Sequence, residues 1–197
     1  TASAAFQFEA GNADGIGSEE EILSQIRSMI SLVPGSNLQD GEVAEASDDL
    51  NRAAEGLDVK RDDARAAAAE LADQHGFFET RAGYAKEMTT GFIRLGGITV
   101  GIFGNTQKCD DRDDGNQLTV NGAYKAADFV RFCDAFDIPL LSLTNVASYE
   151  ASLYAEKALG QAAARLIYAL ASASVPKINV ITKKAVGTAF LAMNAKS

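Results

Sequence analysis

The segment Lys183–Phe190 carries the residue pattern most suited to chemistry in this 197-residue chain. An apolar run, Ile178–Thr182, precedes it and predicts a buried strand, and Gly187, Thr188 and Ala189 then open a predicted helix. The first N–H groups of a helix have no acceptor within the helix, and the helix dipole favours negative charge beside them. The turn therefore predicts an oxyanion hole for an enolate or ureido oxygen. Close packing of a helix on a strand favours the same small residues and is the competing interpretation.

The other reactive side chains favour structural explanations. Cys133 lies on the apolar face of a predicted helix, so we expect a core residue and not a nucleophile. His75 stands beside a predicted helix end, where a positive charge is favourable without catalysis. The segment Asp110–Gly115 is similar to part of a calcium loop, but Arg112 occupies a ligand position and Asn121 replaces the bidentate glutamate. We expect a solvated acidic loop there.

Composition excludes several classes of function. The net charge of −9, from 27 acidic and 18 basic residues, argues against nucleic acid or an anionic membrane surface as a partner. One histidine and two cysteines cannot build a multi-histidine metal site, a zinc ribbon or a disulfide framework, so we expect no metal. No apolar stretch reaches the ~18 residues of a membrane span. Free thiols predict a reducing compartment, and we expect a cytoplasmic location.

The N-terminal part predicts an arm followed by a helix. Phe6 and Phe8 alternate, which predicts a short edge strand or a frayed arm. Ser18 and Glu21 form a capping box, apolar residues then recur at helical spacing, and Pro34 with its following glycine ends the helix. Because the first residue is threonine and not methionine, we expect the chain to be a piece of a longer protein.

Three stretches are predicted to lie at the surface. Residues 35–60 have few apolar side chains and indicate a linker or a loosely held segment. Asp62–Gln74 is alanine-rich with a single large apolar residue, which predicts a peripheral helix. The i,i+3 spacing of Asp128, Arg131 and Asp134 predicts a salt-bridged solvent face of a later helix.

The second half of the chain alternates between strands and helices. Two glycines join the apolar runs Phe92–Leu95 and Ile98–Phe103, which predicts a hairpin, and residues 106–122 predict a long polar loop. The pattern then predicts an amphipathic helix (Ala123–Phe136), a strand buried on both faces (Ile138–Thr144) and a long helix (Glu150–Ala171). A second buried strand (Ile178–Thr182) and a short helix from about Ala185 follow. This order implies an α/β class with parallel strands and right-handed crossovers.

A resemblance to a known family rests on the twelve residues Phe129–Leu140, FVRFCDAFDIPL. They resemble the carboxyltransferase subunit of biotin-dependent acyl-CoA carboxylases and the related methylmalonyl-CoA decarboxylases. The same family pattern is similar to this chain at Phe77–Glu79, Gly91–Leu95, Val100–Ile102, Lys125–Ala127, Val175–Thr182 and Lys184-Ala185. The resemblance covers about residues 75–195.

The resemblance implies an α/β fold of the crotonase-like (ClpP/crotonase) class, built from ββα repeats and incomplete in this chain. It divides the chain into the tail and last helix of a preceding N-terminal half (1–35), a linker and peripheral helix (36–74), and a truncated C-terminal carboxyltransferase domain (75–197). The family fold continues past the position of Ser197. We therefore expect a fragment that is inactive alone or active only in an assembly.

The resemblance also implies a reaction: biotin-dependent carboxyl transfer between carboxybiotin and a short-chain acyl-CoA. Acetyl-CoA carboxylase, propionyl-CoA carboxylase and methylmalonyl-CoA decarboxylase are enzymes of this type. The implied cofactor is biotin on a separate biotin carboxyl carrier protein or domain, and no metal is expected. The implied partners are the acyl-CoA, the carrier protein and further copies of the chain in a homo-oligomer, with a membrane partner subunit only for a decarboxylase.

The family motifs assign roles to six residues of this chain. The backbone amides of Thr188 and Ala189, after Gly187, would form the biotin-side oxyanion hole, where the family has Gly-Gly-Ala. Asn145 and Val146 would contact biotin from the loop that reads Asp-Val-Pro-Gly-Phe in the family. Leu191 would line the acyl pocket.

Two other functions stay open at this point. The departures from the family pattern at Asn145–Tyr149 and at Thr188 favour a non-catalytic scaffold or fragment that keeps the fold and the subunit interface. Another crotonase-like acyl-CoA enzyme that works without biotin, such as a thioester hydrolase, is the third hypothesis.

Overall fold

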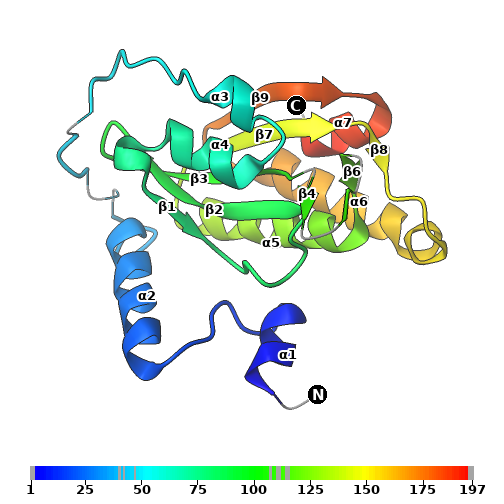
Figure 1. Cartoon of the computed structure of the whole chain (residues 1–197), viewed down its shortest axis with the longest axis horizontal. Coiled ribbons are helices and arrows are strands. Elements are labelled where there is room, and N and C mark those ends of the chain that lie inside the picture. Colours follow the sequence, from blue (N-terminus) through cyan, green and yellow to red (C-terminus); the bar gives the residue numbers. More distant parts are fainter. Residues whose placement is uncertain are drawn as a thin grey trace.

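The computed structural model describes residues 3–39, 41, 43–46, 48–106, 108–109, 112–113 and 116–194. Its centre is a five-stranded sheet with the order β1-β2-β3-β7-β9 (Figure 1). These strands are β1 (Phe77–Glu79), β2 (Met88–Leu95), β3 (Ile98–Asn105), β7 (Leu140–Val146) and β9 (Lys177–Ala185). The first three pair antiparallel, whereas β3, β7 and β9 run parallel, which confirms the predicted parallel strands.

The predicted hairpin is present as β2 and β3. Gly96 and Gly97 form its turn with φ of +59° and +80°, a backbone region that glycine adopts without strain. The carboxylate of Asp73 accepts hydrogen bonds from both glycine amides, at 3.1 and 2.8 Å. The turn is therefore fixed both by its own residues and by the segment that precedes the sheet.

Helices cover both faces of the sheet (Figure 1). The helices α5 (Val120–Ala135) and α6 (Leu153–Ser172) pack on one face with the larger apolar core, in which Phe92 and Phe103 lie. On the other face α4 (Ala64–Leu71) packs its alanines against Ile93, Ile102 and neighbouring side chains. Adjacent strand residues thus point to opposite faces, as the alternation of a strand requires.

The helix α4 corrects the prediction of a peripheral helix. Ala64, Ala67 and Ala68 are buried, because small side chains let this helix approach the sheet closely. A helix can therefore belong to the core without large apolar residues. The predicted range also shortens: Asp63 caps the helix through its side chain, and a 3₁₀ turn, η1 (Asp73–His75), follows.

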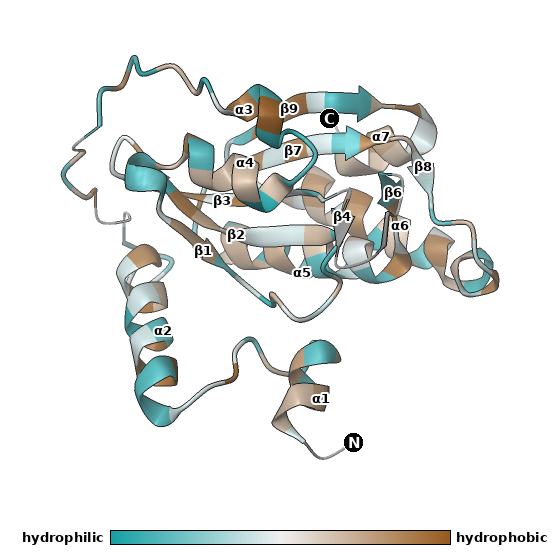
Figure 2. Cartoon of the chain, in the orientation of Figure 1, coloured by the Kyte–Doolittle hydropathy of each residue, from teal (hydrophilic) through white to brown (hydrophobic). Residues whose placement is uncertain are grey.

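The strand β9 corrects a second prediction. It is the edge strand of the described sheet, and Ile178 and Ile181 are 65% and 53% exposed. By contrast, β7 is buried at every position, as predicted. The carboxyl half of β9 is hydrophilic because it carries Lys183 and Lys184 (Figure 2).

The N-terminal part lies beside the sheet and is mainly helical (Figure 1). Phe6 and Phe8 belong to α1 (Ala4–Glu9), so the prediction of an edge strand or frayed arm was wrong there. The capping box predicted at Ser18 and Glu21 is confirmed at the start of α2 (Glu19–Leu32). Between α2 and the single turn α3 (Leu57–Lys60), the described residues form no helix or strand.

The remaining elements are short. They are β4 (Lys108–Cys109), β5 (Arg112–Asp113), β6 (Gln117–Leu118), β8 (Ser148–Tyr149) and α7 (Gly187–Met193). The predicted polar loop of residues 106–122 thus contains three two-residue strands and the start of α5. The acidic loop predicted at Asp110–Gly115 lies outside the described residues except for the backbone of Arg112–Asp113.

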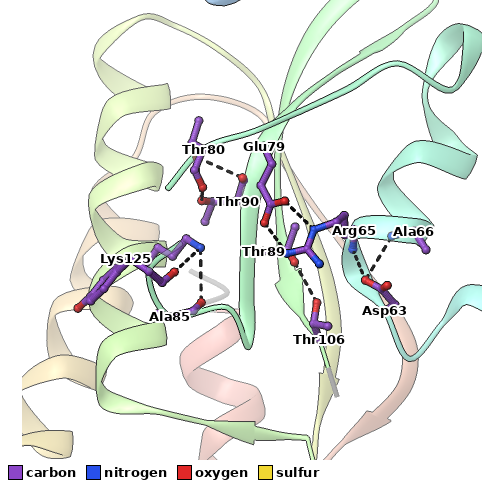
Figure 3. A network of polar contacts seen from close by, with 11 residues as sticks. Asp63, Arg65, Ala66, Glu79, Thr80, Ala85, Thr89, Thr90, Thr106 and Lys125 are labelled. Carbon is purple, nitrogen blue, oxygen red and sulfur yellow. Dashed lines mark hydrogen bonds and ion pairs between the residues drawn. The ribbon is translucent and has the colours of Figure 1, made fainter. Parts of the chain in front are cut away.

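Polar side chains tie β1 and the loop after it to the surrounding helices (Figure 3). Arg65 of α4 forms two hydrogen bonds with the carboxylate of Glu79, at 2.6 and 2.7 Å. Lys125 of α5 is buried, and its ammonium donates to the carbonyls of Tyr84 and Ala85, at 2.7 and 3.4 Å. These contacts hold the segment that connects β1 and β2 against α5.

Candidate functional site

The turn between β9 and α7 is the candidate site. It lies at the carboxyl ends of β7 and β9, the edge at which parallel sheets bind ligands. Val186 caps α7 without a side-chain hydrogen bond, and its N–H donates to the carbonyl of Val146 at 3.1 Å. The position of the turn is therefore fixed by a backbone contact to the neighbouring strand.

Gly187 opens α7 in a conformation that suits close approach to the backbone. Its φ is +61°, and a Cβ added there would meet no atom within 4 Å. The amides of Thr188 and Ala189 follow in the first turn, where a helix leaves its N–H groups without internal acceptors. The hydroxyl of Tyr149 donates to the carbonyl of Thr188 at 3.0 Å and thereby orients this turn. The arrangement can stabilise negative charge on an oxygen through backbone donors.

The side chains of α7 divide between the core and solvent. Ala189, Ala192 and Met193 are buried in the core beside α6, whereas Thr188 is exposed. Leu191, predicted for the acyl pocket, is 60% exposed on the outer side of the helix. The structure therefore brings Gly187, Thr188 and Ala189 together and leaves the side chain of Leu191 largely exposed to solvent.

Asn145 and Val146, predicted to contact biotin, are both buried at the end of β7. Val146 belongs to the apolar core. The amide of Asn145 donates to Asp62 Oδ1 at 3.0 Å, and its oxygen accepts the N–H of Lys184 at 3.2 Å. Both ends of this side chain are thus engaged within the protein.

Asp62 is a residue of this region that the sequence pattern did not reveal. It lies between α3 and α4, and its carboxylate contacts the ammonium of Lys183 at 2.7 and 2.9 Å. The hydrogen bond from Lys183 lowers the pKa of the Asp62 carboxyl, against a smaller opposing effect of burial. A contact across 121 residues of chain leaves no local signal in the sequence.

A cavity of 560 Å³ lies elsewhere, between α2 and the face formed by β1, β2 and α5. Apolar side chains dominate its lining, with Ile26 and Met29 on one side and Phe78, Phe92 and Phe129 on the other. No residue of β7, β9 or α7 contributes to it. This apolar cavity is therefore separate from the candidate site.

The other candidates from the sequence have structural roles. Cys133 is buried in the core, and burial raises the pKa of its thiol, as expected for a residue that is not a nucleophile. The Nδ1 of His75 lies 3.1 Å from the carbonyl of Ala69 near the end of α4. These positions agree with the structural explanations given for both residues.

The charged face of α5 is paired differently from the prediction. Asp128 contacts Arg165 of α6 at 2.6 Å and Arg81 at 3.5 Å, and does not pair along its own helix. Asp134 accepts hydrogen bonds from the amide and hydroxyl of Ser174. The face is thus salt-bridged at Asp128, as predicted, but the partners come from helix α6 and the β1–β2 connection and not from i,i+3 pairs.

The described residues contain neither a cluster suited to a metal ion nor a helix suited to a membrane. No group of three or more His, Cys, Asp or Glu side chains has the arrangement of a metal site in the part of the chain that the structure describes. Within the same residues, every helix is too short or too polar to cross a membrane.

Comparisons with known proteins identify the architecture. The model of the carboxyl transferase domain family matches residues 6–197. The mitochondrial propionyl-CoA carboxylase beta chain of Sus scrofa is 36% identical over 184 residues, which are 89% of this chain and 33% of that protein. The methylmalonyl-CoA decarboxylase subunit alpha of Veillonella parvula is 32% identical over 183 residues, again 89% of this chain, and 35% of that protein.

A solved structure agrees with these relatives. The hexameric transcarboxylase 12S with hydrolysed methylmalonyl-coenzyme A superposes with a TM-score of 0.88 at 30% identity, over 97% of this chain and 39% of that one. The fold is accordingly the crotonase-like fold of the carboxyltransferases, present in part. The chain spans about a third of the length of the curated relatives it matches. The resemblance recognised in Phe129–Leu140 is thus confirmed, and the chain belongs to the carboxyl transferase domain family.

Proposed function

We propose that the chain forms the biotin-side half of an active site for carboxyl transfer between carboxybiotin and a short-chain acyl-CoA. The observation that carries the proposal is the open turn at Gly187, which presents the first amides of α7 at the carboxyl edge of the parallel strands. Family membership and the propionyl-CoA carboxylase and methylmalonyl-CoA decarboxylase relatives support the reaction class.

In this proposal the functional groups of the site are backbone N–H donors and not side chains. The N–H groups of Thr188 and Ala189 would hold the ureido oxygen of biotin, and Gly187 would leave space beside them, because a Cβ there meets no atom within 4 Å. Biotin, when bound, supplies the group that carries the carboxyl unit. The chain's contribution is to hold fixed donors where negative charge develops, so that no dipole has to reorient during the reaction. Leu191 would join the acyl pocket only where another part of the protein or another subunit covers it.

The proposed partners follow from the same reaction. They are an acyl-CoA, a biotin carboxyl carrier protein and further copies of the chain, with a membrane partner subunit only for a decarboxylase. The hexamer of transcarboxylase 12S supports a homo-oligomer. We propose a cytoplasmic location, although relatives such as the Sus scrofa protein are mitochondrial.

The direct test is decarboxylation of methylmalonyl-CoA or malonyl-CoA by the complete protein, with free biotin as the carboxyl acceptor. Thr188→Pro removes one proposed amide donor, and we expect turnover to fall by about 10²-fold, the usual cost of losing an oxyanion-hole donor. Thr188→Ala keeps the amide and is the matched control, with turnover near that of the unmodified protein. Equal turnover in both variants would place the hole elsewhere.

One observation favours the second hypothesis, a non-catalytic scaffold. Asn145 and Val146 are both buried. The side-chain amide of Asn145 donates to Asp62 and accepts from the N–H of Lys184, so neither residue is available to biotin in this arrangement. A folded, oligomeric protein without biotin-dependent turnover of any short acyl-CoA would support the scaffold.

A further inference from the structure

We propose that Asp62 is a positioning residue for the candidate site, because it fixes a bulge in β9 immediately before the Gly187 turn. This inference rests on the proposed function for its catalytic consequence, but the fixation itself is a property of the fold. It assigns a role to the segment between α2 and β1, which reaches the site from the opposite half of the sequence.

The bulge is visible in the pairing of β7 with β9. Thr144 pairs with Ile181 and Val146 pairs with Ala185, so Asn145 alone faces the three residues Thr182–Lys184. We call these three residues the β9 bulge. Two surplus residues cannot join the regular ladder, so the polar groups of the bulge need other partners.

Asp62 and Asn145 supply those partners. Asn145 Oδ1 accepts the N–H of Lys184 at 3.2 Å and thus replaces a ladder hydrogen bond. Both carboxylate oxygens of Asp62 contact the ammonium of Lys183, and one also accepts from Asn145 Nδ2 at 3.0 Å. The three side chains form a connected network in which every bond involves the bulge or the residue opposite it.

The network lies directly upstream of the proposed donors. The bulge ends at Lys184, regular pairing resumes at Ala185, and Gly187 follows two residues later. A shift of the bulge is therefore carried by Ala185 and Val186 into the first turn of α7. Because a misplacement of about 1 Å can cost 10²-fold in rate, a tether at this point affects chemistry without touching a substrate.

The carboxylate beside Asn145 belongs to Asp62, which is distant in the sequence. The resemblance places an aspartate at this position, in the Asp-Val-Pro-Gly-Phe motif, and this chain has the uncharged Asn145. The negative charge next to Lys183 comes instead from Asp62, 83 residues away from Asn145 in the sequence. Exchanging the charge and the amide between the two positions is therefore a rescue experiment for the network.

The first measurement is hydrogen exchange of the peptide that covers residues 182–190 in the complete protein. Asp62→Asn removes the charge, and we expect exchange in this peptide to accelerate by about 10-fold, since local stability governs the opening of such segments. Asp58→Asn is the matched control. Asp58 lies four residues before Asp62 and forms an exposed ion pair with Arg61. The double variant Asp62→Asn/Asn145→Asp returns one carboxylate and one amide to the contact and should restore slow exchange.

The second measurement is decarboxylation kinetics on the same proteins. We expect kcat to fall by about 10-fold in Asp62→Asn, with the KM for acyl-CoA unchanged and with recovery in the double variant. If Asp62→Asn does not fold, Lys183→Met removes the other partner of the ion pair and should give the same two changes.

Unchanged exchange at residues 182–190 would overturn the tether, whatever the activity. Faster exchange with an unchanged kcat would overturn the positioning role. An inactive unmodified protein would count against the proposed function alone, since the exchange measurement still decides the tether.

Discussion

Two neighbouring parallel strands, β7 and β9, show how much of a strand's environment its own sequence leaves open. Both carry apolar runs, and both run in the same direction beside one another. Yet all seven positions of β7 are buried, whereas five of the nine in β9 are exposed. The difference arises because β7 lies between β3 and β9 and has helices over both faces, while β9 has one strand neighbour among the described residues.

The difference is chemical as well as steric. The strand β7 carries no charged residue, whereas β9 carries Lys177, Lys183 and Lys184. The exposed strand is thus the one that can offer polar and charged contacts to the segment around Asp62. The candidate site lies at the ends of both strands, where the buried strand β7 is held on both sides and the edge strand β9 is open to solvent.

The largest expected effect contrasts a side chain from each strand. Leu143→Ala in β7 removes a buried side chain at 2% exposure and should lower the free energy of unfolding by about 2–5 kcal/mol. Ile181→Ala in β9 should cost less than ~1 kcal/mol, because half of that side chain already contacts water. Urea unfolding with a parallel measurement of molecular mass tests both. Equal losses would show that β9 is covered in solution, for example by a second copy of the chain.

A medium effect concerns the polar contact between the two strands. Asn179 of β9 donates to Ser142 Oγ at 2.6 Å and to Thr144 Oγ1 at 2.7 Å. Asn179→Ala leaves both buried hydroxyls without this donor and should cost about 1–3 kcal/mol. A double-mutant cycle with Ser142→Ala should show coupling, measured by urea unfolding. Additive losses would mean that the contact between Asn179 and Ser142 does not stabilise the pairing of the two strands.

The smallest effect is a pH dependence that arises from the ion pair between Asp62 and Lys183 of β9. The hydrogen bond from Lys183 lowers the pKa of Asp62, so its stabilising contribution is complete above the unfolded value of about 3.9. The contribution disappears as pH falls through the lowered folded value. Unfolding free energies of the unmodified protein and Asp62→Asn should therefore differ at pH 7, by less than ~1 kcal/mol for this partly exposed pair, and converge at acid pH. A constant difference between pH 7 and pH 3 would contradict this assignment.

Local sequence signals predicted those elements whose ends are marked by capping or turn residues. The capping box at Ser18 and the glycine pair of the hairpin were predicted correctly, because they act within a few residues. The two phenylalanines of α1 were misread, since two alternating residues do not define a period and Ser3 provides a cap. The start of α5 lies three residues earlier than predicted, where Thr119 caps the helix.

Non-local features were beyond the sequence pattern. The burial of α4 depends on its closeness to the sheet, and the exposure of β9 depends on how many strands flank it. The open turn at Gly187 was predicted from its small residues and is present. The partners of Asn145 were not predictable, because Asp62 reaches it from a segment with no regular spacing signal.

The lysines of β9 have a consequence for solubility during synthesis and storage. An edge strand displays unpaired backbone groups and can recruit another extended chain, which starts aggregation. Lys177, at the first position of β9, and Lys184, near its end, place positive charge at both ends of this edge, whereas Lys183 is paired with Asp62. A second β9 approaching edge to edge would meet like charge and lose hydration of its ammonium groups. The same residues that border the candidate site thus act as gatekeepers against strand-to-strand assembly.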